Sequence, residues 1–146
     1  MLRITPEIIT ELNDNEVMVF GANAEGSHWG GAARVAYEKF GAVWGEGIGK
    51  FGRSYAIPTL IFPTTTTGKV TKMPIEAIDD CVKDFIKYAT EHPELTFYVT
   101  PIGCGIAGFQ PEEIAPLFFD ALLLENVYLP QSFITILMVN YKNIIK

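Results

Sequence analysis

The sequence is poor in cysteine and histidine, and these shortages exclude several kinds of site. Its 146 residues include two cysteines and two histidines. Cys81 and Cys104 form neither a C-x-x-C pair nor a disulfide framework, which indicates a reducing compartment. The histidines and cysteines are scattered along the chain and predict no zinc site. We therefore expect neither a metal nor a cofactor.

The chain also has few positive charges. It holds 11 Lys and Arg residues against 17 Asp and Glu residues, a formal net charge of −6. A protein that binds DNA or RNA along its length is expected to carry a basic stripe, so we expect no long nucleic acid as a partner. A small anion is still compatible with this charge, because backbone dipoles can hold it locally.

Long apolar runs are missing as well. No run reaches the ~18 residues that a membrane-spanning helix needs, and residues 1–7 lack the apolar core of a secretory signal. We expect a cytoplasmic protein with no membrane partner. The composition, 49% hydrophobic and 19% charged, is that of a globular protein. Without linker or repeat, the length predicts one domain over residues 1–146.

Short apolar runs alternate along the chain with stretches of helical periodicity. The runs predict buried strands at 17–20, 55–57, 97–99 and 127–129. The periodic stretches predict helices at 33–40, 75–89 and 111–122. Residues 134–139 fit a strand or a buried helix, of which we favour the helix. Residues 64–69 predict a surface loop and Gly45–Gly49 a mobile loop.

This alternation predicts an α/β fold, a three-layer α/β/α sandwich with a mainly parallel, mixed sheet.

Glycine-dense turns follow two of the strands, at residues 21–33 and 103–109, and each leads into a helix. In such sheets ligands bind at the carboxyl ends of the strands. Glycine lets a ligand approach the backbone, and the N–H groups at a helix start attract anions. Two such turns could hold the two phosphates of a pyrophosphate; the alternative is that the glycines only form tight turns.

Neither turn matches a P-loop or a dinucleotide fingerprint. Gly105-Ile106-Ala107-Gly108-Phe109 is instead similar to the second phosphate loop of macro domains, which commonly reads Gly-Ile-Tyr-Gly followed by Tyr or Phe. Val19-Phe20-Gly21-Ala22-Asn23 resembles the macro-domain strand that ends in Ala-Asn. Gly103-Cys104-Gly105 resembles the Ile-Gly-Cys-Gly turn of one branch of macro-like proteins. The resemblance covers positions 17–40 and 96–124.

The resemblance implies a macro-domain-like fold that binds ADP-ribose, with Asn23 facing the distal ribose. It implies ligand contacts at Gly21, Ala22, Asn23, Gly30, Gly31, Ala32, Gly103, Cys104, Gly105, Ile106, Ala107, Gly108 and Phe109. The family usually has an Asp shortly after its first strand that reads the adenine amino group. Asp14 precedes the Val17 strand and does not match that position.

Several of these residues have a second interpretation. Asn23 would orient a ribose hydroxyl or a water, or else cap the turn. His28 would be a general acid or base at neutral pH, or a solvent-facing loop residue. Phe109 would stack on the ligand or belong to the core. Cys104 lies near a helix start, where a thiol pKa can fall, but it has no sequence-local partner and we favour an inert residue.

The sequence thus predicts a protein that binds ADP-ribose or a related nucleotide diphosphate, free or on an ADP-ribosylated macromolecule. If it is an enzyme, the resemblance implies hydrolysis of an ADP-ribosyl bond, with Asn23 and His28 as the catalytic candidates. Two alternatives remain open: a reader module without turnover, and a small phosphatase that acts on a nucleotide.

Overall fold

The computed structural model of the chain describes residues 2–62 and 71–144. Within these residues six strands form one mixed sheet in the order β2-β3-β1-β5-β6, with β4 paired to β3. The strands are β1 (Glu16–Asn23), β2 (Gly49–Phe51), β3 (Ser54–Phe62), β4 (Thr71–Lys72), β5 (Thr96–Val99) and β6 (Val127–Tyr128). β1 runs parallel to β3 and to β5, and β5 runs parallel to β6, whereas β2 and β4 are antiparallel to β3.

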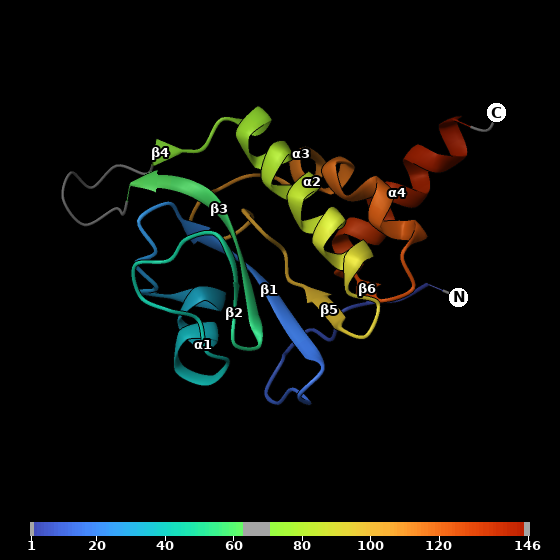
Figure 1. The fold of residues 1–146 in the computed structure, drawn as a ribbon. Coiled ribbons are helices and arrows are strands. Elements are labelled where there is room, and N and C mark those ends of the chain that lie inside the picture. The colour runs from blue at the N-terminus through green and yellow to red at the C-terminus, as the bar shows by residue number, and fades with distance from the viewer. Residues whose placement is uncertain (1, 63–70, 145–146) are drawn as a thin grey trace.

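Helices cover both faces of this sheet. They are α1 (Gly31–Lys39), α2 (Ile75–Glu91), α3 (Pro111–Ile114), the 3₁₀ helix η1 (Ala115–Leu123) and α4 (Gln131–Ile144). Figure 1 shows α1 on one side of the sheet and α2, α3 and α4 on the other. The predicted α/β fold, with a mixed sheet between helices, is confirmed.

The two faces of β1 belong to different hydrophobic clusters. Val17 and Val19 join the larger cluster, which lies under α2, η1 and α4. Met18 and Phe20 point to the opposite face and pack with Ala33 and other residues of the α1 side. Successive side chains of a strand alternate between faces, so an unbroken apolar run from residue 17 to residue 20 fits a strand covered on both sides.

Most predicted elements are present, and the differences have local causes. The third predicted helix is divided into α3 and η1, because Pro116 lacks an N–H and its ring crowds the preceding turn. Strand β3 continues through Pro58 instead of stopping there. Pairing with β2 ends at Ala56 and pairing with β4 begins at Leu60, so Pro58 lies where the outer side of β3 has no neighbour. Residues 134–139, which fit either a strand or a helix, belong to α4, so the favoured helix is confirmed.

The sequence prediction missed β2 and β4, which are three and two residues long. The segment predicted to be a mobile loop, Gly45–Gly49, leads into β2, and a glycine with positive φ, Gly52 (φ 58°), turns the chain back into β3. Such short strands carry too few residues for a period-2 pattern. The loop predicted at 64–69 lies outside the described residues.

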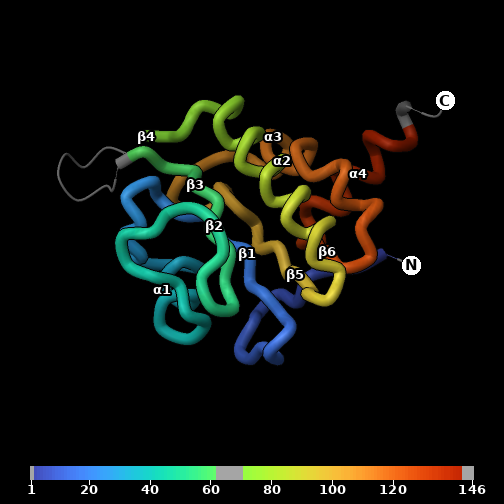
Figure 2. The backbone as a smooth tube through the Cα atoms, in the orientation of Figure 1, coloured from blue at the N-terminus to red at the C-terminus, as the bar shows by residue number. Residues whose placement is uncertain are grey.

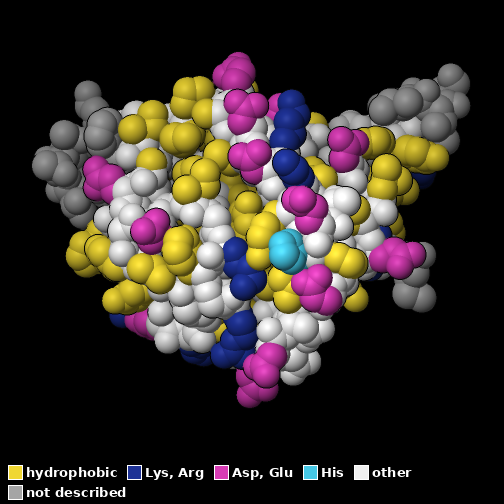
Figure 3. Space-filling model, in the orientation of Figure 1, with side chains coloured by type: hydrophobic (Ala, Val, Ile, Leu, Met, Phe, Trp, Pro, Cys, Tyr) yellow, Lys and Arg dark blue, Asp and Glu magenta, His cyan; other side chains and the backbone are white. Residues whose placement is uncertain are grey.

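The N-terminal segment extends the far edge of the sheet. Ile4 forms a parallel bridge with Leu129, and Figure 2 shows this segment running beside β6. On the face shown in Figure 3, acidic side chains lie among the Lys and Arg side chains. No helix in the described part of the chain is long and apolar enough to cross a membrane.

The order of the strands places a crevice beside the end of β1. From β1 the chain passes through α1 to β3 on one side, and it later returns through α2 to β5 on the other side of β1. Connections on opposite faces leave a crevice at the carboxyl ends of the strands, where ligands of open α/β sheets bind. Both predicted glycine turns begin there, at the ends of β1 and β5.

Candidate functional site

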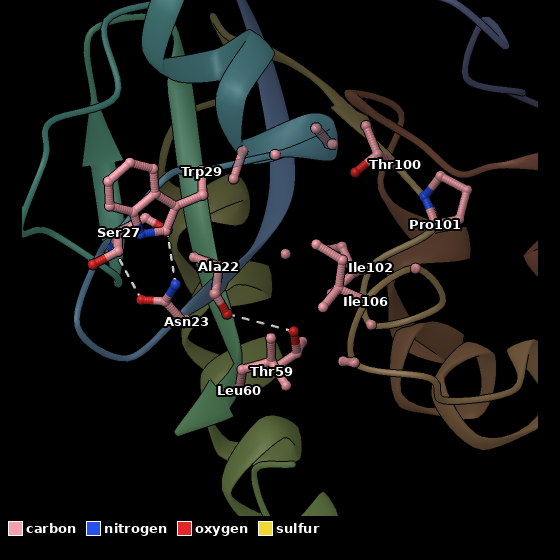
Figure 4. A pocket seen from close by; sticks show the side chains of 18 residues that line it. Ala22, Asn23, Ser27, Trp29, Thr59, Leu60, Thr100, Pro101, Ile102 and Ile106 are labelled. Carbon is pink, nitrogen blue, oxygen red and sulfur yellow. Dashed lines mark hydrogen bonds between the residues drawn. The ribbon is translucent and has the colours of Figure 1, made fainter. Parts of the chain in front are cut away.

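A cavity of about 190 Å³ lies at the carboxyl ends of β1, β3 and β5. Two segments form its walls, which we name the first loop (residues 24–30) and the second loop (residues 100–108) (Figure 4). The lining residues are Gly21, Ala22, Asn23, Ser27, Trp29, Gly30, Gly31, Ala32, Ala33, Thr59, Leu60, Thr100, Pro101, Ile102, Gly103, Gly105, Ile106 and Ala107. The two glycine turns, about 80 positions apart in the sequence, therefore meet at one site.

The lining carries no formal charge. Among the described residues that border the cavity there is no Asp, Glu, Lys, Arg or His. Its side-chain hydroxyls come from Ser27, Thr59 and Thr100, and two of them are already used. The Thr100 hydroxyl donates to the carbonyl of Val19 at 2.7 Å, and that of Thr59 donates weakly to the carbonyl of Ala22 at 3.4 Å. Backbone groups therefore supply most of the polar chemistry of this site.

The first residues of α1 line the cavity. The N–H groups of Gly31, Ala32 and Ala33 have no acceptor within the helix, as at any helix start, and all three residues line the cavity. Gly30 at the N-cap has extended backbone and makes no side-chain cap, and the first turn holds no acidic residue. An anion is the ligand that such a helix start favours.

The second loop approaches the end of β1 backbone to backbone. A Cβ added to Gly21 would lie 3.2 Å from the Gly103 nitrogen, so a larger residue there would push the loop away. Gly103 has φ 76°, which favours glycine, and its carbonyl accepts a 2.8 Å hydrogen bond from the N–H of Phe109. These contacts bring Gly105, Ile106 and Ala107 to the cavity wall.

Most of the predicted ligand residues reach the cavity, and four candidates do not. Those that line it are Gly21, Ala22, Asn23, Gly30, Gly31, Ala32, Gly103, Gly105, Ile106 and Ala107. Those outside the lining are His28, Cys104, Gly108 and Phe109. The first group lies in three short runs, at the end of β1, at the start of α1 and in the second loop.

Asn23 holds the first loop in place. It is 9% exposed, its Nδ2 donates to the carbonyl of Ser27 at 2.7 Å, and its Oδ1 accepts from the N–H of Ser27 at 2.9 Å. Both ends of the amide are therefore engaged within the loop, which is the turn-capping interpretation. One N–H and one lone pair remain for a ligand at the cavity wall.

His28 is neither solvent-facing nor directed into the cavity. It is 1% exposed, and its ring lies among those of Phe20, Tyr37 and Trp44, with centroid distances of 5.5, 6.1 and 6.1 Å. Nε2 lies 2.9 Å from the carbonyl of Val43, which can only accept, so Nε2 carries the proton and donates. The expectation of a solvent-facing residue is wrong, and the ring instead packs the first loop onto the segment that follows α1.

The other three candidates outside the cavity are surrounded by other parts of the protein. Burial, with Glu112 and Glu113 nearby, raises the pKa of the Cys104 thiol, which fits the favoured inert interpretation. Phe109 is 8% exposed and belongs to the larger core cluster. Gly108 lies beside Lys72, whose Nζ donates to the Gly108 carbonyl at 3.2 Å and sits 4.6 Å from the Phe109 ring centre. Phe109 thus has the core role that was its second interpretation.

The sequence prediction missed several lining residues: Ser27, Trp29, Ala33, Thr59, Leu60, Thr100, Pro101 and Ile102. For Thr100 and Pro101 a signal existed, because they directly follow the predicted strand 97–99 and ligands bind at strand ends. Thr59 and Leu60 lie beyond Pro58, and the predicted strand 55–57 ends before that proline, so the sequence prediction does not include them.

A second, larger cavity of about 630 Å³ adjoins the first. The two share Ala32, Thr100 and Pro101 in their linings. The second cavity is otherwise bordered by residues 4–9, by Met18 and Val35, and by residues 130–132. Thr5 lies in its wall, 6% exposed, with a hydroxyl that has no hydrogen-bond partner among the described residues.

No protein-family model matches the chain, and no curated protein matches it. A solved structure, that of a protein of unknown function from Bacteroides thetaiotaomicron, is similar to it with a TM-score of 0.61. The match covers 88% of this chain and 94% of that one at 15% sequence identity. At this identity the likeness shows the fold alone. The macro-domain resemblance stays a prediction.

Proposed function

We propose that the chain binds ADP-ribose or a related nucleotide diphosphate in the cavity between its two glycine loops. One observation carries the proposal: the uncapped start of α1 and the backbone of the second loop meet at one uncharged cavity. Backbone N–H groups at a helix start and in glycine turns bind phosphates without cationic side chains. Two such groups of donors match a ligand with two phosphates better than a ligand with one phosphate.

The sizes of the two cavities support a ligand that extends beyond its phosphates. The first cavity, about 190 Å³, is below the range of roughly 300–1,000 Å³ that is usual for ligand pockets. The second, about 630 Å³, adjoins it at Ala32, Thr100 and Pro101 and has a largely apolar wall. We place the diphosphate in the first cavity and the nucleoside in the second.

The lining favours binding over turnover. A hydrolase of the usual kind needs a nucleophile or a general base at the reacting atom. The described lining residues include no His, Cys, Asp or Glu, and the amide of Asn23 is engaged with Ser27. We therefore propose a reader of ADP-ribose. The hydrolase and the nucleotide phosphatase are weaker alternatives, since each requires an activating group that this lining does not provide.

Calorimetry with ADP-ribose and AMP tests the proposal. If both groups of donors bind phosphate, ADP-ribose should bind at least about tenfold more tightly than AMP, a difference of ~1.4 kcal/mol. Equal affinities, or no binding of either ligand, would overturn it. Release of ADP-ribose from an ADP-ribosylated substrate at a rate above that of a heat-denatured sample would instead favour the hydrolase.

A further inference from the structure

An exposed aromatic group lies at the rim of the proposed diphosphate cavity. Trp29 lines the cavity and is 63% exposed. Its indole meets that of Trp44 edge to face, with centroids 4.7 Å apart and an interplanar angle of 87°. The ring of Trp44 in turn packs against that of Tyr37, with centroids 5.4 Å apart. We name Trp29, Tyr37 and Trp44 the aromatic platform.

Buried contacts hold this platform in place before any ligand binds. His28, next to Trp29 in the chain, is buried and donates to the carbonyl of Val43, next to Trp44. The Asn23 amide fixes Ser27 on the other side. These contacts restrict the backbone on both sides of the indole, which lowers the conformational entropy that the protein loses when a ring stacks on it.

The platform and the second cavity lie at different ends of the first cavity. Figure 4 shows Trp29 and Ser27 on one side of the cavity, and Thr100 and Pro101 on the other. Thr100 and Pro101 border the second cavity, whereas no member of the platform does. A ligand with its diphosphate between the loops and its nucleoside in the second cavity therefore directs its other end toward Trp29.

We propose that the aromatic platform stacks a flat heteroaromatic ring carried by that other end, so that the preferred ligand class is a dinucleotide. This inference rests on the proposed function and narrows its ligand from ADP-ribose to a diphosphate with a ring at each end. Aromatic side chains are common stacking surfaces for such rings. A cationic ring suits the site further, because the chain has a net charge of −6 and aromatic faces attract cations.

NAD⁺ and ADP-ribose form a matched pair of probes, because NAD⁺ differs by a cationic nicotinamide ring on the distal ribose. Calorimetry should show that NAD⁺ binds at least about tenfold more tightly, within the contribution usual for stacking on an aromatic ring. Trp29→Ala should bring the ratio of the two affinities close to one. Trp29→Phe should restore part of the ratio, and Leu123→Ala, at an 80% exposed position on η1, should leave it at the wild-type value.

Fluorescence gives a readout that does not depend on affinity. The chain has two tryptophans, so Trp44→Phe leaves Trp29 as the single indole, with an aromatic ring still beneath it. In this variant saturating NAD⁺ should quench the emission strongly and saturating ADP-ribose should not. Circular dichroism would check that each variant remains folded.

The outcomes separate the two proposals. If neither ligand binds, the proposed function and the platform both fail. If ADP-ribose binds and NAD⁺ binds equally or more weakly, only the platform fails. A change in oligomeric state with Trp29→Ala, without a change in the affinity ratio, would overturn the platform and assign this surface to contacts between proteins.

Discussion

The two glycine loops border one cavity but are held in different ways. The first loop is fixed by side chains and close packing: Asn23 bonds both backbone groups of Ser27, and His28 donates to the carbonyl of Val43. The second loop has backbone hydrogen bonds of its own, from Phe109 to Gly103 and from Gly108 to Gly105, and the side chains of Thr100 and Lys72 bond the carbonyls of Val19 and Gly108. The glycines in and beside the loops also differ in how closely the chain surrounds them.

Gly26 in the first loop and Gly47, in the segment that packs against it, make room for neighbouring chain. A Cβ on Gly26 would overlap the backbone of Glu46, and a Cβ on Gly47 would overlap the carbonyl oxygen of Asn23. In the second loop Gly105 faces open space, with nothing within 4 Å of an added Cβ. A glycine at a packed position supports folding, whereas a glycine in the open leaves space for a ligand. Substitutions at Gly47 and Gly105 test this difference between packed and open positions.

The largest expected effect is on stability, when a glycine in a packed position and a glycine in open space are each replaced by alanine. Neither Gly47 nor Gly105 has a positive φ, so alanine is conformationally allowed at both. Gly47→Ala must displace backbone and should lower the free energy of unfolding by about 3 kcal/mol, at the upper end of overpacking effects. Gly105→Ala should change it by less than ~0.5 kcal/mol. Urea unfolding measures both, and equal effects would contradict the comparison.

The next effect concerns Asn23. Asn23→Ala removes two hydrogen bonds to the backbone of Ser27, so it should lower the free energy of unfolding without ligand by about 1–3 kcal/mol. Ligand affinity should fall as a consequence, because the first loop loses its position. Denaturant unfolding and calorimetry on the same variant give both values. A loss of affinity at unchanged stability would show instead that Asn23 contacts the ligand directly.

Blocking the cavity should weaken binding while leaving the fold intact. Gly30 has extended backbone, and an added Cβ would point toward Ile106 across the cavity, 4.0 Å from its Cδ1. Threonine caps helices about as well as glycine, so Gly30→Thr should keep α1 intact, fill this gap and occupy a helix donor. We expect at least about a tenfold loss of ADP-ribose affinity, ~1.4 kcal/mol, by calorimetry. Wild-type affinity in a folded Gly30→Thr protein would place the ligand elsewhere.

The smallest effect is that of salt. The described residues that line the cavity include no Lys or Arg, and the chain has a net charge of −6. Salt screens repulsion between the protein and an anionic ligand more than any attraction. Affinity for ADP-ribose should therefore stay constant or rise slightly when ionic strength increases from about 0.05 to about 0.3 M. A steep fall would mean that Lys or Arg side chains bind the phosphates.

The fold could be predicted from the sequence to a large extent, because apolar runs and helical periodicity are local signals. Val17 to Phe20 is apolar on both faces, and both faces are buried. β2 and β4 were missed because strands of two or three residues have no period. The third helix is split at Pro116, because a proline within an otherwise periodic helical pattern interrupts the helix.

The site was predictable in position but not in the orientation of its side chains. Glycine turns after two strands located the cavity, because parallel strands share a carboxyl edge. The orientation of His28, for example, depends on its contact with Val43, which lies 15 positions along the chain. Such contacts leave no local pattern. Trp29 is another such case, since it is exposed and its ring contact is with Trp44, 15 positions along the chain.

The central claim is that backbone N–H groups at the start of α1 and in the second loop bind the phosphates, and amide chemical shifts test it most directly. ¹⁵N-labelled protein would be titrated with ADP-ribose, and separately with AMP as a comparison. We predict that the largest shifts with ADP-ribose fall on Gly31, Ala32 and Ala33 at the start of α1 and on Gly105, Ile106 and Ala107 in the second loop. Shifts confined to one loop, shifts only at residues outside the cavity, or no shifts at saturating ligand would contradict the claim.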